Sequence, residues 1–140
     1  NRFTDSTNVS LHLLGGEDLP ATGDVDLVMT LDCLHDMPRP DLAMAAIRGA
    51  IAPDGTWLVK EIRSSPDWHK NRRNPMLAMM FAASVSTCMA SAMSTPDGLG
   101  LGTLGLDPAT LAEMTSAAGF TGFVQHAVDD PTNLYYEVRP

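Results

Sequence analysis

Apolar residues along the chain follow a period of two in some segments and a period near 3.6 in others, a pattern that predicts strands alternating with helices. In residues 8–14, Val9, Leu11 and Leu13 alternate with other residues, as in a strand near a sheet edge. Residues 25–31 are almost continuously apolar, which is typical of a central parallel strand covered on both faces. We therefore expect both segments in one sheet.

A helix is expected after the second strand, because Leu42, Ile47 and Ile51 recur at helical spacing behind two prolines. The Pro-Asp-Gly sequence at residues 53–55 predicts a stop and a turn. Residues 56–62 are then typical of the next strand. A strand, a crossover helix and a second strand in this order place the two strands parallel to one another, so the predicted class is α/β.

Two further helix starts are marked by a capping side chain followed by proline, at Asn74 and at Asp107. The first opens an uncharged helix over residues 74–94. The second helix is expected to end at Gly119, which suits a left-handed C-cap. Beyond it, residues 120–140 resemble two strands joined by a turn, so an antiparallel hairpin should extend the parallel sheet.

The formal charge of −8, from 17 acidic and nine basic residues, disfavours binding to nucleic acid and to anionic lipid. The only basic cluster, residues 69–73, is too short for a nucleic-acid footprint, so we expect no direct nucleic-acid binding by this segment. Two cysteines without a secretory signal indicate a reducing, cytoplasmic location.

The uncharged helix over residues 74–94 would be about 30 Å long, near the thickness of a bilayer core. It contains five serine or threonine residues and lacks an aromatic belt, so we expect a buried or pocket-lining helix and no membrane partner. Its methionines suit either the core or an adaptable lid over an apolar acceptor. Cys88 is expected to pack as a small hydrophobic residue in either case.

Two carboxylates, a thiol and an imidazole fall within residues 32–36, in the side chains of Asp32, Cys33, His35 and Asp36. A metal site would need three or four ligands to converge, which one short turn rarely allows. A nucleophilic Cys33 would need His35 as its base in a special turn. Two interpretations remain open: one wall of a cofactor pocket, or a structural role in which Asp36 caps the following helix and His35 packs.

The order of four segments, GGEDLP, DLVMTLDCLHDMPRP, IAPDGTWLVKEI and AGFTGF, resembles the C-terminal half of a class I S-adenosylmethionine-dependent methyltransferase. The most specific segments are residues 84–103 and the tail DPTNLYYEVRP. They look like bacterial methyltransferases that carry an N-terminal winged-helix domain.

This resemblance implies a Rossmann-like sheet with strand order 3-2-1-4-5-7-6 and an antiparallel seventh strand. Residues 1–140 would be the C-terminal part of a single methyltransferase domain and would supply strands three to seven, with the first two strands missing. The glycine-rich cofactor loop would precede Asn1, so the chain alone should be inactive. Residues 8–14 would then lack a sheet partner and should be poorly paired or displaced.

The resemblance also implies site residues. Catalysis would use His35 and Glu61 as candidate proton acceptors, although a buried-edge ion pair with Lys60 or Arg63 is the alternative for Glu61. We expect no metal. The residues expected to bind the cofactor are Gly16, Glu17, Asp18, Leu19, Asp32 and Cys33. Those expected to bind the acceptor are His35, Asp36, Met80, Ser84 and Met89.

The implied function is methyl transfer from S-adenosyl-L-methionine to a small-molecule acceptor, as part of a longer parent protein. The alternative is a methyltransferase-like module for ligand sensing or dimerisation in a winged-helix regulator. A second copy of the parent, bound through the region before Asn1, is a further expected partner.

Overall fold

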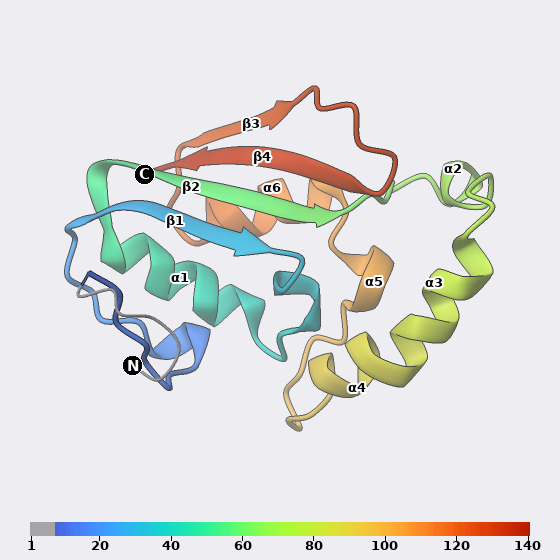
Figure 1. Ribbon diagram of the computed structural model, residues 1–140, viewed down its shortest axis with the longest axis horizontal. Helices are drawn as coiled ribbons and strands as arrows, with labels where there is room; N and C mark the ends of the chain where they lie inside the picture. Colours follow the sequence, from blue (N-terminus) through green and yellow to red (C-terminus); the bar gives the residue numbers. More distant parts are fainter. Residues whose placement is uncertain (1–7) are drawn as a thin grey trace.

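Four strands form one mixed sheet in the computed structural model, which describes residues 8–140 (Figure 1). The sheet order is β1-β2-β4-β3; β1 and β2 are parallel, and β4 is antiparallel to both of its neighbours. The predicted α/β class and terminal hairpin are confirmed. The order also matches strands four, five, seven and six of the sheet that the resemblance implies. The strands are β1 (Val25–Leu31), β2 (Ile51–Ile62), β3 (Gly122–His126) and β4 (Asn133–Arg139).

The helical elements connect these strands and extend beyond the carboxyl ends of β1 and β2 (Figure 1). Two short 3-10 helices are η1 (Gly16–Asp18) and η2 (Leu34–Asp36), and η3 (Ser84–Cys88) is a π-helix. The α-helices are α1 (Pro40–Ala50), α2 (Trp68–Asn71), α3 (Leu77–Ala83), α4 (Met89–Ala92), α5 (Gly102–Gly105) and α6 (Pro108–Ala117).

The core lies between the sheet and two helices, α1 and α6, which pack on the same face. Met44 and Ile47 of α1 and Leu111 of α6 join Trp57 and Tyr136 of the sheet in one buried cluster. Leu42, one of the apolar residues whose spacing predicts α1, is 43% exposed. The predicted turn at residues 53–55 lies inside β2, where the register against β1 shifts.

Helix α6 has the ends that the sequence predicts. The side chain of Asp107 accepts hydrogen bonds from the backbone N–H groups of Ala109 and Thr110 at 2.9 and 3.3 Å. These bonds satisfy donors of the first turn that have no partner within the helix. The chain leaves the helix through Gly119, whose φ of +93° is readily adopted only by glycine.

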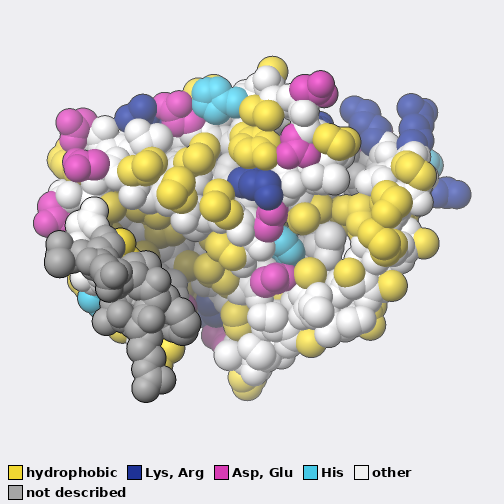
Figure 2. Space-filling model, in the orientation of Figure 1, with side chains coloured by type: hydrophobic (Ala, Val, Ile, Leu, Met, Phe, Trp, Pro, Cys, Tyr) yellow, Lys and Arg dark blue, Asp and Glu magenta, His cyan; other side chains and the backbone are white. Residues whose placement is uncertain are grey.

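The outer face of β1 is uncovered, which contradicts the prediction of a central strand covered on both faces. Leu27, Met29 and Leu31 are 54%, 57% and 53% exposed, and β1 is an edge strand among residues 8–140. Only the opposite side, with Val28 and Thr30, faces the core. Figure 2 shows hydrophobic side chains exposed along this region of the sheet. The apolar run of β1 therefore includes an outer surface that none of the described residues covers.

The strand predicted over residues 8–14 is wrong, because no strand forms there. Val9, Leu11 and Leu13 are exposed, the last completely. Alternation alone cannot form a strand without a neighbour to complete its backbone hydrogen bonds. The absence of pairing agrees with the expectation that this segment lacks a sheet partner.

The uncharged helix is less regular and more exposed than predicted. It starts at Leu77 because the side chain of Asn74 first accepts the N–H of Met76 at 2.9 Å, in a turn before the helix. The run then passes through η3 and ends at Ala92. Its buried residues, Ser84, Cys88 and Ala92, are four apart and make one narrow stripe. Of the two alternatives that the sequence left open, burial in the core is therefore wrong for most of this segment, whereas the pocket-lining alternative agrees with the cavities that Met76, Met80 and Met89 line. Within residues 8–140, no helix is long and apolar enough to cross a membrane.

Candidate functional site

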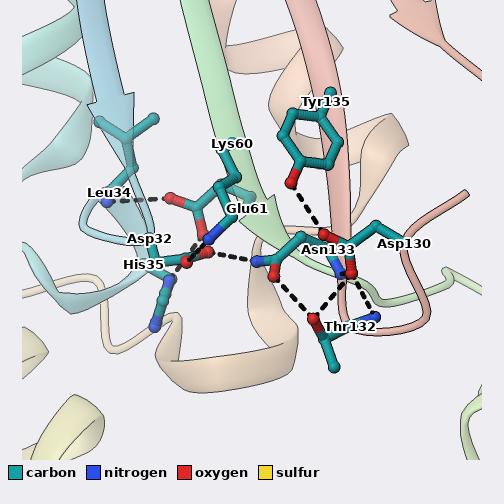
Figure 3. A network of polar contacts seen from close by, with 9 residues as sticks. All are labelled: Asp32, Leu34, His35, Lys60, Glu61, Asp130, Thr132, Asn133 and Tyr135. Carbon is teal, nitrogen blue, oxygen red and sulfur yellow. Dashed lines mark hydrogen bonds and ion pairs between the residues drawn. The ribbon is translucent and has the colours of Figure 1, made fainter. Parts of the chain in front are cut away.

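Polar side chains converge where β1 and β2 end, as the parallel arrangement predicts (Figure 3). Asp32 follows β1 with a φ of +53°, a left-handed conformation that costs a non-glycine residue about 1 kcal/mol. Three contacts hold it there. Its N–H donates to the carbonyl of Lys60 at 2.8 Å, Lys60 Nζ donates to its Oδ2, and Asn133 Nδ2 donates to its Oδ1 at 2.5 Å.

Glu61 is the buried centre of the site, with 1% of its surface exposed. Its Oε1 accepts the N–H of Leu34 at 2.9 Å, and its Oε2 lies 2.6 Å from Nδ1 of His35. Both contacts come from η2, so one carboxylate fixes the backbone and the imidazole of the loop after β1. His35 is itself 3% exposed. A buried carboxylate is stable only with such partners.

Charges around His35 favour its protonated form. Burial alone lowers the pKa of the imidazole, but the hydrogen bond to Glu61 and the charges of Glu61 and Asp36 outweigh burial and raise this pKa to about 9. Burial has the opposite consequence at the neighbouring thiol, where it raises the pKa of Cys33. At neutral pH His35 is therefore mostly protonated and can accept a proton only in its neutral form, whereas Cys33 is not activated as a nucleophile.

The other wall of the site comes from η3. The hydroxyls of Ser86 and Thr87 donate to the carbonyls of Ala82 and Ala83, at 2.6 and 2.7 Å, and so compete with the backbone pattern of an α-helix. A widened π turn at this place is consistent with that competition. The turn directs Ser84 and Cys88 inward.

Helix α5 packs closely against this wall. A Cβ at Gly102 would lie 2.7 Å from Sδ of Met89, and the φ of +62° at this residue also favours glycine. The next residue, Thr103, donates its N–H to Oγ of Ser84 and its hydroxyl to Sγ of Cys88, both at 3.2 Å. The Cys88 sulfur is thereby held in place beside His35 and Asp36.

Three potential ligands therefore meet, one each from His35, Asp36 and Cys88. Their ligand atoms all lie within 4.8 Å of one another. Nε2 of His35 is 3.2 Å from Oδ1 of Asp36. The sequence placed the first two together, but it assigned Cys88 only a packing role.

Two structural roles that the sequence left open are not observed: the cap of the following helix by Asp36, and the ion pair of Glu61 with Lys60 or Arg63. Asp36 does not cap α1, whose N-cap is Arg39 with no side-chain cap. Glu61 pairs with neither of its basic neighbours. Lys60 pairs with Asp32, and Arg63 donates to the backbone carbonyls of residues 130 and 133. The ion pair of Glu61 is instead with His35.

The predicted cofactor residues lie in two places. Gly16 to Leu19 form an exposed turn around η1, and Gly16 packs against Ala43 and Met37 at the start of α1. The carboxylates of Glu17 and Asp18 have no cationic partner within residues 8–140. Asp32 and Cys33 lie at the end of β1, and both Asp32 oxygens already accept hydrogen bonds.

The predicted acceptor residues border three different spaces. His35 and Asp36 lie beside Cys88. Met80 lines a cavity of about 1000 Å³ between α3, the end of β2 and the β3–β4 turn. Ser84 and Met89 line a second cavity of about 340 Å³, and Asn71 lines both cavities. The five residues are not brought into one pocket.

Several residues of this site carried no signal in the sequence. Asn133 reaches Asp32 across 101 positions, from the start of β4. Asp130 organises the turn before it: its carboxylate accepts hydrogen bonds from the N–H and hydroxyl of Thr132 and from the hydroxyl of Tyr135, all at 2.8 Å (Figure 3). The pairing of β4 with β2 brings these residues to β1, and the antiparallel hairpin was the only available clue.

Comparison with known proteins gives fold neighbours only. No protein-family model and no curated protein sequence matches the chain. Among solved structures, the chain resembles the trans-methyltransferase CalH in complex with SAH, with 20% identity, a TM-score of 0.61 and coverage of 98% of this chain and 38% of that one. It also resembles human N-acetylserotonin methyltransferase in complex with SAM, with 18% identity, a TM-score of 0.60 and coverage of 98% and 35%.

A third neighbour is an O-methyltransferase family protein from Burkholderia thailandensis, with 19% identity, a TM-score of 0.57 and coverage of 94% and 35%. The chain thus spans little more than a third of the length of these three proteins. At these identities the likeness shows the fold: a partial Rossmann-like methyltransferase sheet.

Proposed function

We propose that the chain is the C-terminal part of a methyltransferase domain that transfers a methyl group from S-adenosyl-L-methionine to a small-molecule acceptor. The observation that carries the proposal is the buried pair of His35 and Glu61 at the carboxyl ends of β1 and β2. Ligands of open α/β sheets bind at this end of the strands. The fold neighbours that contain SAM or SAH support the choice of cofactor.

Residues of this chain fit one side of the cofactor. The exposed turn formed by Gly16, Glu17, Asp18 and Leu19 offers two carboxylates that have no cationic partner within residues 8–140, and an exposed apolar side chain. These groups suit an amino group or ribose hydroxyls beside a flat ring. Asp32 and Cys33 would border the same ligand from the end of β1. S-adenosyl-L-methionine, when bound, supplies a methyl group on a sulfonium, which is transferred as the carbon–sulfur bond breaks.

The neutral form of His35 is the proposed proton acceptor for the acceptor group. Glu61 holds Nδ1, so Nε2 is the ring nitrogen at which a proton would be taken up. Glu61 acts as a positioning residue, because its carboxylate orients the ring and stabilises the imidazolium. Asp36, with 40% of its side chain exposed, lies 3.2 Å from Nε2 through its Oδ1 and would border the acceptor.

The exposed edge and outer face of β1 support a preceding segment in the parent protein. Leu27, Met29 and Leu31 form an apolar surface of the kind that a covering helix or strand would bury. We propose that a strand preceding Asn1 in the parent protein pairs with the free edge of β1 and that the preceding segment completes the cofactor site. On this account the 140-residue chain alone binds the cofactor weakly, and micromolar binding by calorimetry would contradict it.

The test is transfer of isotopically labelled methyl groups by the complete parent protein, assayed with a panel of small phenols, amines and carboxylates. We expect transfer to at least one small molecule and a loss of rate in His35→Ala. Circular dichroism checks that the variant is folded. Cofactor binding without transfer to any acceptor would contradict the proposal and favour the ligand-sensing alternative.

A further inference from the structure

We propose that His35, Asp36 and Cys88 form a binding site for a zinc ion. Their nitrogen, oxygen and sulfur atoms lie within 4.8 Å of one another. Imidazole, carboxylate and thiolate are the ligands that zinc takes in proteins, whereas magnesium and calcium prefer oxygen alone. The residue types therefore select zinc among the common divalent ions.

The imidazole is oriented as a zinc ligand usually is. Zinc-bound histidines commonly donate their second N–H to a carboxylate, which fixes the ring. Glu61 accepts from Nδ1 of His35 at 2.6 Å in this way, and Nε2 remains for the ion. Figure 3 shows the second ring nitrogen on the side of His35 away from Glu61.

The spacing of two ligand atoms already suits one ion. Nε2 of His35 and Oδ1 of Asp36 are 3.2 Å apart. With bonds of about 2.0–2.1 Å, two atoms on a tetrahedral zinc ion are about 3.4 Å apart. The Asp36 oxygen is buried and has no hydrogen bond of proper alignment. A buried acceptor whose contact with Nε2 of His35 falls short of hydrogen-bond geometry is incompletely satisfied, and a cation between the two atoms would satisfy it.

Cys88 supplies the third ligand from a different part of the chain. Its side chain is buried, and the Thr103 hydroxyl donates to its sulfur at 3.2 Å, which fixes the position of the sulfur. Zinc binding would ionise this thiol and release its proton to solvent. Three protein ligands leave a fourth position open to water.

Zinc bound at this site would inhibit methyl transfer. This inhibition rests on the proposed function, but the zinc site does not rest on it. The ion would bind the Nε2 lone pair that the proposed reaction uses to accept a proton. Zinc binding and proton acceptance at His35 therefore exclude one another.

The test uses cobalt(II) as a spectroscopic substitute for zinc, added to the purified 140-residue chain and to its parent. We expect one cobalt ion per chain, a thiolate-to-cobalt charge-transfer band, and loss of both signals on addition of zinc. Cys88→Ser should abolish the band. Cys33→Ser is the matched control, because Cys33 is the other free thiol and should leave the band unchanged.

Absence of the band in the unaltered chain, or its loss in Cys33→Ser but not in Cys88→Ser, would overturn the site. Asp36→Asn gives an independent variant, because its half-exposed side chain can change without unfolding the chain; it should weaken cobalt binding by about tenfold or more. Equal affinity in Asp36→Asn would also count against the site.

The inhibition is tested separately on the parent protein. Zinc should lower the rate of methyl transfer and a chelator should restore it, and both effects should be lost in Cys88→Ser. A rate that zinc does not change, in a protein that binds cobalt at Cys88, would overturn the inhibition. Cobalt binding in a protein that transfers no methyl group would remove the proposed function and leave the zinc site supported.

Discussion

His35 and Glu61 are 26 positions apart in the chain, yet Nδ1 of one lies 2.6 Å from Oε2 of the other in the interior. The loop after β1 and the end of β2 meet there because the two strands are parallel neighbours. One carboxylate therefore links the two elements, and it bonds the backbone of Leu34 as well.

Glu61 should contribute to the free energy of unfolding mainly through the hydrogen bonds that its oxygens accept, and less through the packing of its side chain. Glu61→Ala leaves the N–H of Leu34 and the imidazole of His35 without a partner, and should lower the free energy of unfolding by about 3 kcal/mol. Glu61→Gln keeps one acceptor oxygen and should cost about 1 kcal/mol. Urea unfolding of both variants is the measurement. Equal losses would show that the hydrogen bonds are not what Glu61 contributes.

The contact between Asn133 and Asp32 should be measurable in the same way. Asn133 is buried and donates to a carboxylate, so Asn133→Ala should lower the free energy of unfolding by about 1–2 kcal/mol. Gln125→Ala, at an exposed position of the neighbouring β3, is the matched control and should change stability little. No difference between the two variants would argue against a role for Asn133 in holding the end of β1.

Asp130 should make the fold sensitive to acid. The hydrogen bonds from the backbone of Thr132 and from the hydroxyls of Tyr135 and Thr132 hold the pKa of Asp130 well below its usual range. Because the unfolded chain binds the proton more readily, the stabilisation is present at neutral pH and is lost as the pH falls below about 4.

Thermal unfolding of Asp130→Asn between neutral pH and about pH 2 checks this claim. The variant should be less stable than the unaltered chain at neutral pH, and the difference should shrink in acid. Asp129→Asn, at the exposed neighbouring position, is the control. A difference that stays constant with pH would contradict the role given to Asp130.

The outer face of β1 gives a test of the proposed parent protein. Met29→Lys should change the stability of the 140-residue chain by less than about 0.5 kcal/mol, since Met29 is 57% exposed. In the parent, where a preceding segment would cover β1, the same change should cost about 2–3 kcal/mol. Val124→Lys on the far strand β3 should be tolerated in both. Equal tolerance of Met29→Lys in chain and parent would contradict the proposed covering segment.

The sequence predicts the sheet well because its strands and turns are governed by local signals. Residues 25–31 and the cap at Asp107 carry their structure in a few neighbouring residues. The prediction from sequence fails where the structure of a segment depends on a neighbouring segment. Residues 8–14 alternate like a strand but have no neighbour to pair with, and the apolar outer face of β1 has no cover among the described residues.

The candidate site was also predicted only in part, because some of its residues carry local signals and others are brought in by the pairing of distant segments. His35 and Glu61 could be named because both follow buried strands. Their contact with one another required the pairing of β1 with β2 and the side-chain geometry of η2. Cys88 reaches them only through the π turn of η3, which no local pattern predicts, and Asn133 only through the register of β4.

The most direct test of the account is a double-mutant cycle on methyl transfer by the parent protein, with His35→Gln, Glu61→Gln and the pair together. If Glu61 acts by orienting the His35 base, each single variant should lower kcat/KM by about 10²–10⁴-fold, and the double variant should lose no more than the worse single one. Full activity in both single variants, or losses that multiply in the double variant, would contradict the claim that the two residues act as one unit.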